Sequence, residues 1–186
     1  SSTKFKFYRM VCGRKMMKFV HYGLAFLLCL LLITSHGCVP SLTSGFSQAE
    51  ALIDEKDYQG AIDLYQEMIN TKVGTTQARQ AQLAMGELYL RVMEKTDQGV
   101  SVYKQLTVDA PESDEAAEAY YRIGIHAFKT EKYKEAGINF ELIVNRFPQL
   151  EISNKAQLML AKSFEKAKQF EKATEVYDQY AARNPK

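Results

Sequence analysis

The sequence has 186 residues, of which 46% are apolar and 25% are charged, as is ordinary for a chain that forms one globular domain. The net charge of +2 is misleading, because charge is divided unevenly along the chain. All six charged residues before Cys38 are positive, which leaves residues 38–186 with 18 Lys and Arg against 22 Asp and Glu, a balance of −4. A nucleic-acid-binding domain needs a basic face in its folded part, and here the positive excess lies in the leader, so we expect no nucleic-acid partner.

The first 37 residues have the layout of a secretory signal. Ser1 is not a start methionine, so we expect translation to begin at Met16 or Met17, behind an upstream extension. Lys18 then provides the positive region, and an apolar core follows at residues 24–33. A transmembrane anchor is the alternative, but the densely apolar part has 15 residues and a span needs about 20.

The end of this leader, Gly37-Cys38, resembles the bacterial lipoprotein signal, in which the cysteine is acylated and becomes the first mature residue. The alternative is an ordinary cleavage site that a cysteine happens to follow. Cys12 and Cys29 fall in the leader, so Cys38 is the one mature thiol and has no partner for an intramolecular disulfide. Acylation explains this lone cysteine, and for such signals Val39 implies transfer to an outer membrane.

Residues 38–46 contain Pro, Ser and Gly, and we expect them to form a flexible tether behind the acylated cysteine. From residue 47 to residue 186 the pattern becomes helical. The clearest unit is residues 115–148, where two amphipathic stretches flank a short polar turn. Pro148 ends the second stretch, because it has no N–H with which to continue the helix. This unit is predicted to be a helical hairpin.

The same pattern recurs along the chain. A small residue in each second helix is followed four positions later by an aromatic residue, and the small residues are 38, 37 and 37 positions apart. The pairs are Ala61 with Tyr65, Gly99 with Tyr103, Ala136 with Phe140 and Ala173 with Tyr177; the last three precede Pro111, Pro148 and Pro185, and the first helices carry Ala49, Gly86, Gly124 and Ala161. We therefore predict an all-α domain of about four hairpins, at residues 47–76, 77–113, 114–150 and 151–186.

These small, aromatic and proline positions resemble the tetratricopeptide repeat, although the usual period is about 34 and the first-helix tryptophan is absent. The resemblance covers roughly residues 42–186 and implies a helical-hairpin solenoid, here preceded by a signal peptide. Repeat two has one extra residue, which we expect at residues 94–97, and Thr75 or Thr76 is expected to cap the helix that follows.

No polar capping helix follows repeat four, although the last hairpin of a solenoid needs one. We expect Phe170, Val176, Tyr177 and Tyr180 to be partly exposed as a result. A truncated chain is the favoured explanation, and self-association or a partner that covers the end are the alternatives.

The sequence holds little that favours an enzyme. His126 is the only histidine after Cys38, so neither a His/Cys metal cluster nor a cysteine–histidine pair can be assembled. His126 lies beside Ala127 in a predicted helix, which favours a surface histidine over a catalytic one. The glycines form no phosphate-binding loop, and the carboxylates of residues 112–118 gather at a helix start, where they favour the helix dipole. We expect no catalysis, no cofactor and no metal.

The resemblance implies a partner-binding groove along the first helices. Tyr121 and Phe128 lie off the apolar stripe of their helix, so their own hairpin is not expected to need them; the alternative is that they pack against neighbouring repeats. The residues at the family's groove positions are Gln80, Leu83, Glu87, Arg91, Glu118, Tyr121, Ile125, Phe128, Lys155, Leu158 and Lys162.

The 37-residue period, the ending at residues 145–148 and the leader together resemble the BamD-like lipoproteins of the outer-membrane β-barrel assembly machine. They are also similar to the repeat domain of the Tol–Pal coordinator CpoB (YbgF). The resemblance implies a lipid-anchored adaptor at the outer membrane, facing the periplasm, that binds envelope proteins or peptides and has no small-molecule substrate. The alternatives are a receptor for extended peptide or saccharide chains and, for location, an exported soluble or signal-anchored protein.

Overall fold

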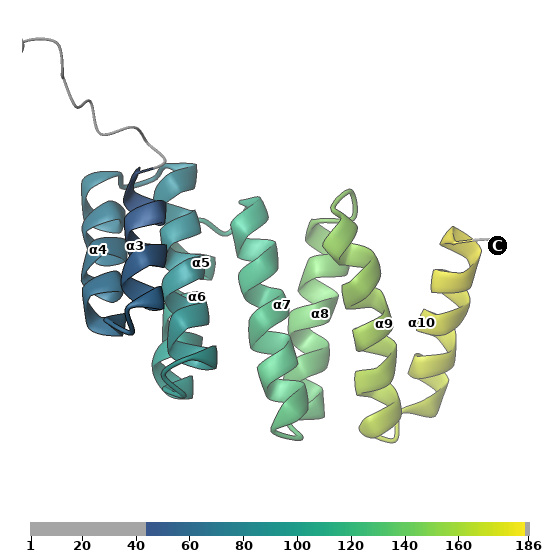
Figure 1. Cartoon of the computed structure of the whole chain (residues 1–186). Coiled ribbons are helices and arrows are strands. Elements are labelled where there is room, and N and C mark those ends of the chain that lie inside the picture. The colour runs from purple at the N-terminus through teal and green to yellow at the C-terminus, as the bar shows by residue number, and fades with distance from the viewer. Residues whose placement is uncertain (1–43, 185–186) are drawn as a thin grey trace, which may run out of the picture. The chain divides into compact units, whose positions relative to one another are not determined.

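The structure is a computed structural model that describes residues 44–184 (Figure 1), so the signal sequence, Cys38 and Pro185 lie outside the described residues. The described helices belong to one compact unit, residues 42–186. In this part of the chain there are eight helices and no strands: α3 (Ser44–Asp54), α4 (Tyr58–Thr71), α5 (Thr76–Arg91), α6 (Thr96–Asp109), α7 (Asp114–Lys129), α8 (Tyr133–Arg146), α9 (Glu151–Lys166) and α10 (Phe170–Arg183).

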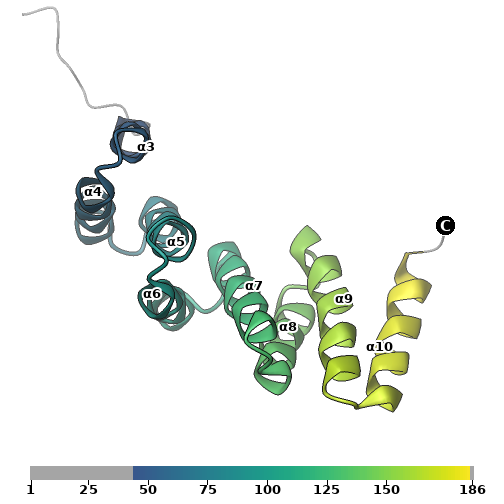
Figure 2. The ribbon, with the colours of Figure 1, turned by 60° about the horizontal axis from the view of Figure 1, so that its bottom comes forward.

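The eight helices form four consecutive hairpins that stack in chain order. Each helix packs against the next one along the chain, and α7 also packs against α5 and α9. Figure 2 shows the first helices α3, α5, α7 and α9 in one row and the second helices α4, α6 and α8 in another. Because a single hairpin is too thin to bury its own apolar side, stacking completes the core. The predicted tetratricopeptide-type solenoid is confirmed.

The paired small and aromatic positions are the places where the two helices of a hairpin meet. Tyr65, Tyr103 and Phe140 are buried, and the rings of Tyr103 and Phe140 lie against the backbone of the preceding first helix. A Cβ atom on Gly124 would come within 2.7 Å of Phe140 Cε1, and one on Gly86 would overlap the ring of Tyr103. Gly86 and Gly124 of the first helices must therefore remain without a side chain, because an aromatic ring of the following second helix occupies that space.

Every turn between the two helices of a hairpin has one non-glycine residue in the left-handed region. These residues are Lys56, Glu94, Glu131 and Lys168, with φ of 63°, 55°, 60° and 60°. Each lies two or three residues after the end of its first helix, and the N–H of the residue that follows bonds back across the turn, as from Lys132 to the Ala127 carbonyl at 2.8 Å. This is the helix-ending geometry that glycine adopts most easily.

A glycine at this turn is expected to stabilise the domain. In Glu131→Gly the relief of left-handed strain exceeds the extra chain entropy of the unfolded state, so the free energy of unfolding should rise by about 0.5–1 kcal/mol. Glu141→Gly, in the middle of α8, is the matched control and should lower it by about 1 kcal/mol. Urea unfolding followed by circular dichroism measures both, and a decrease for Glu131→Gly would contradict the interpretation of this turn.

The extra residue of repeat two lies before Glu94, at the end of α5, and not within residues 94–97 as expected. The N–H of Met93 bonds to the Leu88 carbonyl at 3.1 Å, which widens the last turn of α5. From Glu94 to Gly99 the spacing is the same as in the other repeats. The insertion is thus absorbed where the helix ends, and the start of the second helix keeps its position.

The structure also corrects the expected end of the tether. Helix α3 begins at Ser44, so the last three residues of the predicted segment 38–46 are helical. Phe46 packs on repeat one, with its ring centroid 6.1 Å from that of Tyr65. At the start of α5, Thr75 accepts a hydrogen bond from the Ala78 N–H at 3.2 Å, as one of the two expected caps.

The last helix is less exposed than predicted. Phe170 is 58% exposed and Tyr177 and Tyr180 are half-buried, in line with the expectation, but Val176 is buried. Val176 belongs to the apolar cluster that includes Leu160 of α9, because it faces the preceding helix. The expectation of exposure was therefore wrong for Val176.

Candidate functional site

All eleven predicted groove residues lie on the first helices α5, α7 and α9, and we call the surface that they form the first-helix face. None of the eleven is fully buried. Gln80, Arg91, Lys155 and Lys162 are exposed, and Leu83, Glu87, Glu118, Tyr121, Ile125, Phe128 and Leu158 are half-buried. Cys38, the predicted lipidation site, lies outside the described residues.

Tyr121 and Phe128 have partners within their own hairpin. The ring of Tyr121 meets that of Phe140 edge-on at a centroid distance of 5.7 Å, and Phe128 meets Tyr133 in the same way at 5.3 Å. Both partners are on α8, so the expectation that the hairpin does not need these rings was wrong. The apolar arc of a packed helix is broad enough to include positions beside the central stripe.

Charged side chains connect repeats two and three across the first-helix face. Glu87 of α5 accepts from Tyr103 Oη at 3.1 Å through Oε2 and pairs with Arg91 Nε at 2.5 Å through Oε1. Arg122 of α7 approaches Glu87 with Nη1 at 3.7 Å and donates from Nε to Glu118 at 2.7 Å. The Glu87 carboxylate therefore interacts with side chains from three helices, through a hydrogen bond from Tyr103 and ion pairs with Arg91 and Arg122.

The net effect of burial and of the charges in this network is to raise the pKa values of Tyr103 and Arg122. Burial raises the pKa of Tyr103, and the charge of Glu87 raises it further, so the hydroxyl keeps its proton and donates. Burial by itself lowers the pKa of Arg122, but Glu118 and Glu87 outweigh it and the net pKa is raised. Arg122 therefore keeps its positive charge near neutral pH, and Tyr103 remains a neutral hydrogen-bond donor.

Two further ion pairs join parts of the chain that the sequence pattern could not bring together. Arg79 of α5 donates from Nε to Glu115 of α7 at 2.8 Å, and both side chains are largely buried. Arg146 of α8 pairs with Glu112, just before α7. Helix α7 begins at Asp114, so the predicted dipole role of these carboxylates is compatible with the fold, but three of the four, Glu112, Glu115 and Glu118, are also held by arginines.

The part of the chain that the structure describes contains no assembled catalytic group. Asp97, Ser101 and His126 line one pocket of about 340 Å³ between α6 and α7, but no hydrogen bond among residues 44–184 joins any two of these side chains. Within the same range no group of three or more His, Cys, Asp or Glu is placed to hold a metal ion. In residues 44–184 no helix has the length and hydrophobicity that a membrane crossing requires.

Comparison with known proteins identifies two families along the repeats. Residues 112–186 match YfiO, described as an outer membrane lipoprotein, and residues 80–113 match a tetratricopeptide repeat family. None of the curated proteins matches the chain significantly.

Several solved structures share the fold. MamA 41-end from Desulfovibrio magneticus RS-1 is 17% identical, with 76% of this chain and 75% of that chain covered and a TM-score of 0.55. A MamA RS-1 double mutant is also 17% identical, with 77% and 75% covered and a TM-score of 0.58. The nearly identical TPR-like repeats from Podosopora anserina are 15% identical, with 76% and 74% covered and a TM-score of 0.55. At these identities the likeness establishes the fold alone, so the chain has the fold of tetratricopeptide-repeat proteins, and its third and fourth repeats match the YfiO family model, described as outer membrane lipoprotein.

Proposed function

We propose that this protein is a membrane-tethered scaffold of the bacterial cell envelope that binds partner proteins along its first-helix face. The observation that carries the proposal is the match of residues 112–186 to an outer membrane lipoprotein family. Stacked helical hairpins present extended surfaces for docking. Acylation of Cys38 would hold this surface at the membrane, and the resemblance to the BamD-like lipoproteins supports a role in outer-membrane protein assembly.

The composition of the first-helix face suits a protein partner. Its exposed members are polar or charged, while Leu83, Ile125 and Leu158 are half-buried apolar residues between them. An apolar centre with a polar rim is the usual anatomy of a protein interface. The network around Glu87 supports this role, because it connects α5 and α7 and so favours a constant spacing between neighbouring repeats.

The test is a charge reversal on this face, because Tyr121 and Phe128 are also needed for packing. The double variant Lys155→Glu/Lys162→Glu alters two exposed side chains of α9, and Lys95→Glu/Lys104→Glu, at exposed positions before and within α6, is the control with the same net charge. After mild cross-linking of membranes, we expect the first variant to lose at least tenfold in recovery of folded partners at a fixed ratio, and the control to retain them.

Two other results would change the conclusion. Recovery of a mixed set of extended peptide or saccharide chains would favour the receptor hypothesis over the scaffold. Equal recovery by both double variants would remove the first-helix face as the docking surface. Separately, mass spectrometry of the mature amino terminus should detect acyl chains on Cys38, and Cys38→Ser should release the protein from membranes; an unmodified cysteine would remove the tether.

A further inference from the structure

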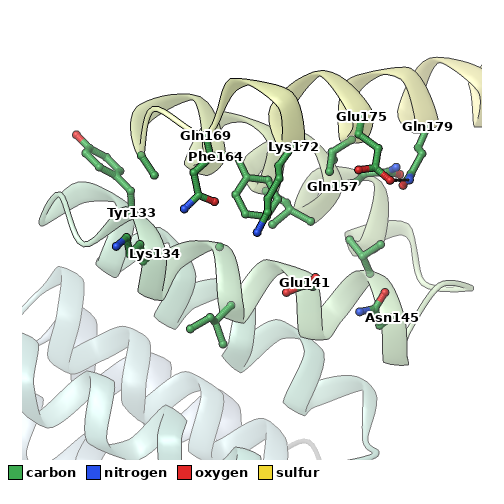
Figure 3. A pocket seen from close by; sticks show the side chains of 16 residues that line it. Tyr133, Lys134, Glu141, Asn145, Gln157, Phe164, Gln169, Lys172, Glu175 and Gln179 are labelled. Carbon is green, nitrogen blue, oxygen red and sulfur yellow. Dashed lines mark hydrogen bonds between the residues drawn. The ribbon is translucent and has the colours of Figure 1, made fainter.

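A groove lies between the second helices of repeats three and four, α8 and α10, with α9 as its floor (Figure 3). Its volume is about 570 Å³. The side chains of α9 that line it include Gln157, Leu160 and Phe164. Lys155, Leu158 and Lys162 of the first-helix face do not line it, so this α8–α10 groove is a separate surface.

Gln157 is an unsatisfied polar group in this groove. The residue is 1% exposed, and among the described residues its Nε2 has no hydrogen-bond partner. A buried donor without an acceptor costs about 1–3 kcal/mol, and native structures contain few of them. In repeat three the corresponding position, four before the small residue of the first helix, is occupied by Tyr120. Repeat four therefore places an amide where the preceding repeat has an aromatic ring.

The remaining lining favours an uncharged ligand. Two lysines, Lys134 and Lys172, are balanced by two carboxylates, Glu141 and Glu175. Lys172 Nζ lies 5.5 Å from the centre of the Phe164 ring, which engages part of this charge within the groove. A strongly charged ligand would find no excess of the opposite sign here.

Side-chain amides add the groups that an extended peptide backbone requires. Asn145, Gln169 and Gln179 line the groove together with Gln157, and Figure 3 shows Gln179 and Glu175 toward the end where Gln157 lies. Each amide offers both donors and an acceptor. An extended backbone has N–H and C=O groups that need such partners, whereas a helix satisfies most of its own. Leu160, Phe164 and Val176 provide apolar contacts for alternate side chains.

We propose that the α8–α10 groove binds an extended, uncharged peptide segment of a partner protein, and that one of its backbone carbonyls accepts a hydrogen bond from Gln157 Nε2. From Tyr133 to Asn145 the rim follows α8 for about 18 Å at the helical rise, which an extended chain covers with five or six residues. The proposal is independent of the first-helix face and of the lipid anchor.

The experiment uses a library of end-capped, uncharged hexapeptides and the full chain, with binding measured by fluorescence polarisation. We expect saturable binding of members that alternate apolar and small polar residues. Gln157→Leu removes the donor and should weaken binding at least tenfold without loss of helical circular dichroism. Ile138→Lys, at a 61% exposed rim position, adds a charge without touching the core and should weaken binding by a similar factor. Gln98→Leu, at an exposed position of α6 outside both surfaces, is the matched control and should bind as the parent does.

Nitrogen-15 NMR adds a direct readout at the donor. The side-chain amide signals that disappear in Gln157→Leu should shift on titration of the parent with the bound hexapeptide. The proposal is overturned if no library member binds, or if both Gln157→Leu and Ile138→Lys bind as tightly as the parent. It is also overturned if an uncharged amphipathic helical peptide binds more tightly than any hexapeptide, or if the groove variants abolish self-association of the chain instead. If Lys155→Glu/Lys162→Glu still binds the hexapeptide, the peptide binds in the α8–α10 groove and not on the first-helix face of the proposed scaffold.

Discussion

Replacement of Phe140 by alanine is expected to lower the free energy of unfolding by about 3–5 kcal/mol. Phe140 is fully buried in α8, where its ring lies against the backbone of Gly124 and contacts Tyr121 edge-on at 5.7 Å. Removal of the ring leaves a cavity that the two helices are too closely packed to close. A domain of ordinary stability has about 5–15 kcal/mol in total, so this one change would remove a large part of it.

Because the repeats form a solenoid, Phe140→Ala is expected to weaken the coupling between neighbouring repeats as well as the stability of the whole domain. Helix α8 connects the packing of α7 to that of α9, and each hairpin contacts only its neighbours. In urea, Phe140→Ala should therefore broaden the transition or divide it, because the repeats before and after α8 lose their coupling. Circular dichroism measures the overall unfolding transition, and hydrogen exchange of the backbone amides distinguishes the repeats before α8 from those after it. Phe170→Ala is the matched control, since Phe170 is 58% exposed, and should change stability by less than about 0.5 kcal/mol. Equal effects of the two variants would contradict the assigned core.

The hairpin architecture was predictable from the sequence because its determinant is local. Each second helix carries a small residue with an aromatic residue one turn later, as in Ala136 and Phe140, and each first helix carries a small residue of its own. Where the two helices cross, that first-helix residue meets the aromatic ring, as Gly124 meets Phe140. The left-handed turn residues recur in the same register, but they are lysines and glutamates rather than glycines. Their types carry no signal, so the conformation at Glu131 had to come from the structure.

The residues of the candidate sites were harder to predict from the sequence than the hairpins, because their contacts form only when neighbouring hairpins stack. Arg79 and Arg122 form ion pairs between α5 and α7, yet the sequence pattern did not single them out, because they approach Glu115 and Glu87 only when α5 and α7 stack. Gln157 was missed for a related reason. Glutamine on a helix is usually a surface residue, and only the packing of α8 and α10 over α9 buries it. Contacts between repeats depend on how one hairpin packs on the next, and the residue pattern of a single helix does not determine that packing.

Replacement of Gly99 by alanine is expected to destabilise the domain, although alanine favours helices. A Cβ atom at this position in α6 would overlap the Leu90 side chain and come within 2.9 Å of the Gly86 carbonyl oxygen. Leu90 can move, but the carbonyl belongs to the backbone of α5, so the two helices must separate. Overpacking of this kind costs about 1–3 kcal/mol, and the better helix propensity of alanine offsets about 1 kcal/mol of it.

Gly137 provides the opposite case within the next second helix. A Cβ atom there would have its nearest neighbours, in Leu160 and Ser163, at 3.8 Å, which is an ordinary contact. Gly137→Ala should therefore gain helix propensity without a clash and raise the free energy of unfolding by up to about 1 kcal/mol. The same substitution is thus expected to act with opposite signs in α6 and α8, as measured by urea unfolding of each variant. If both variants were stabilised, the close approach of α5 and α6 would not be the reason that repeat two has glycine where Ala61, Ala136 and Ala173 stand in the other repeats.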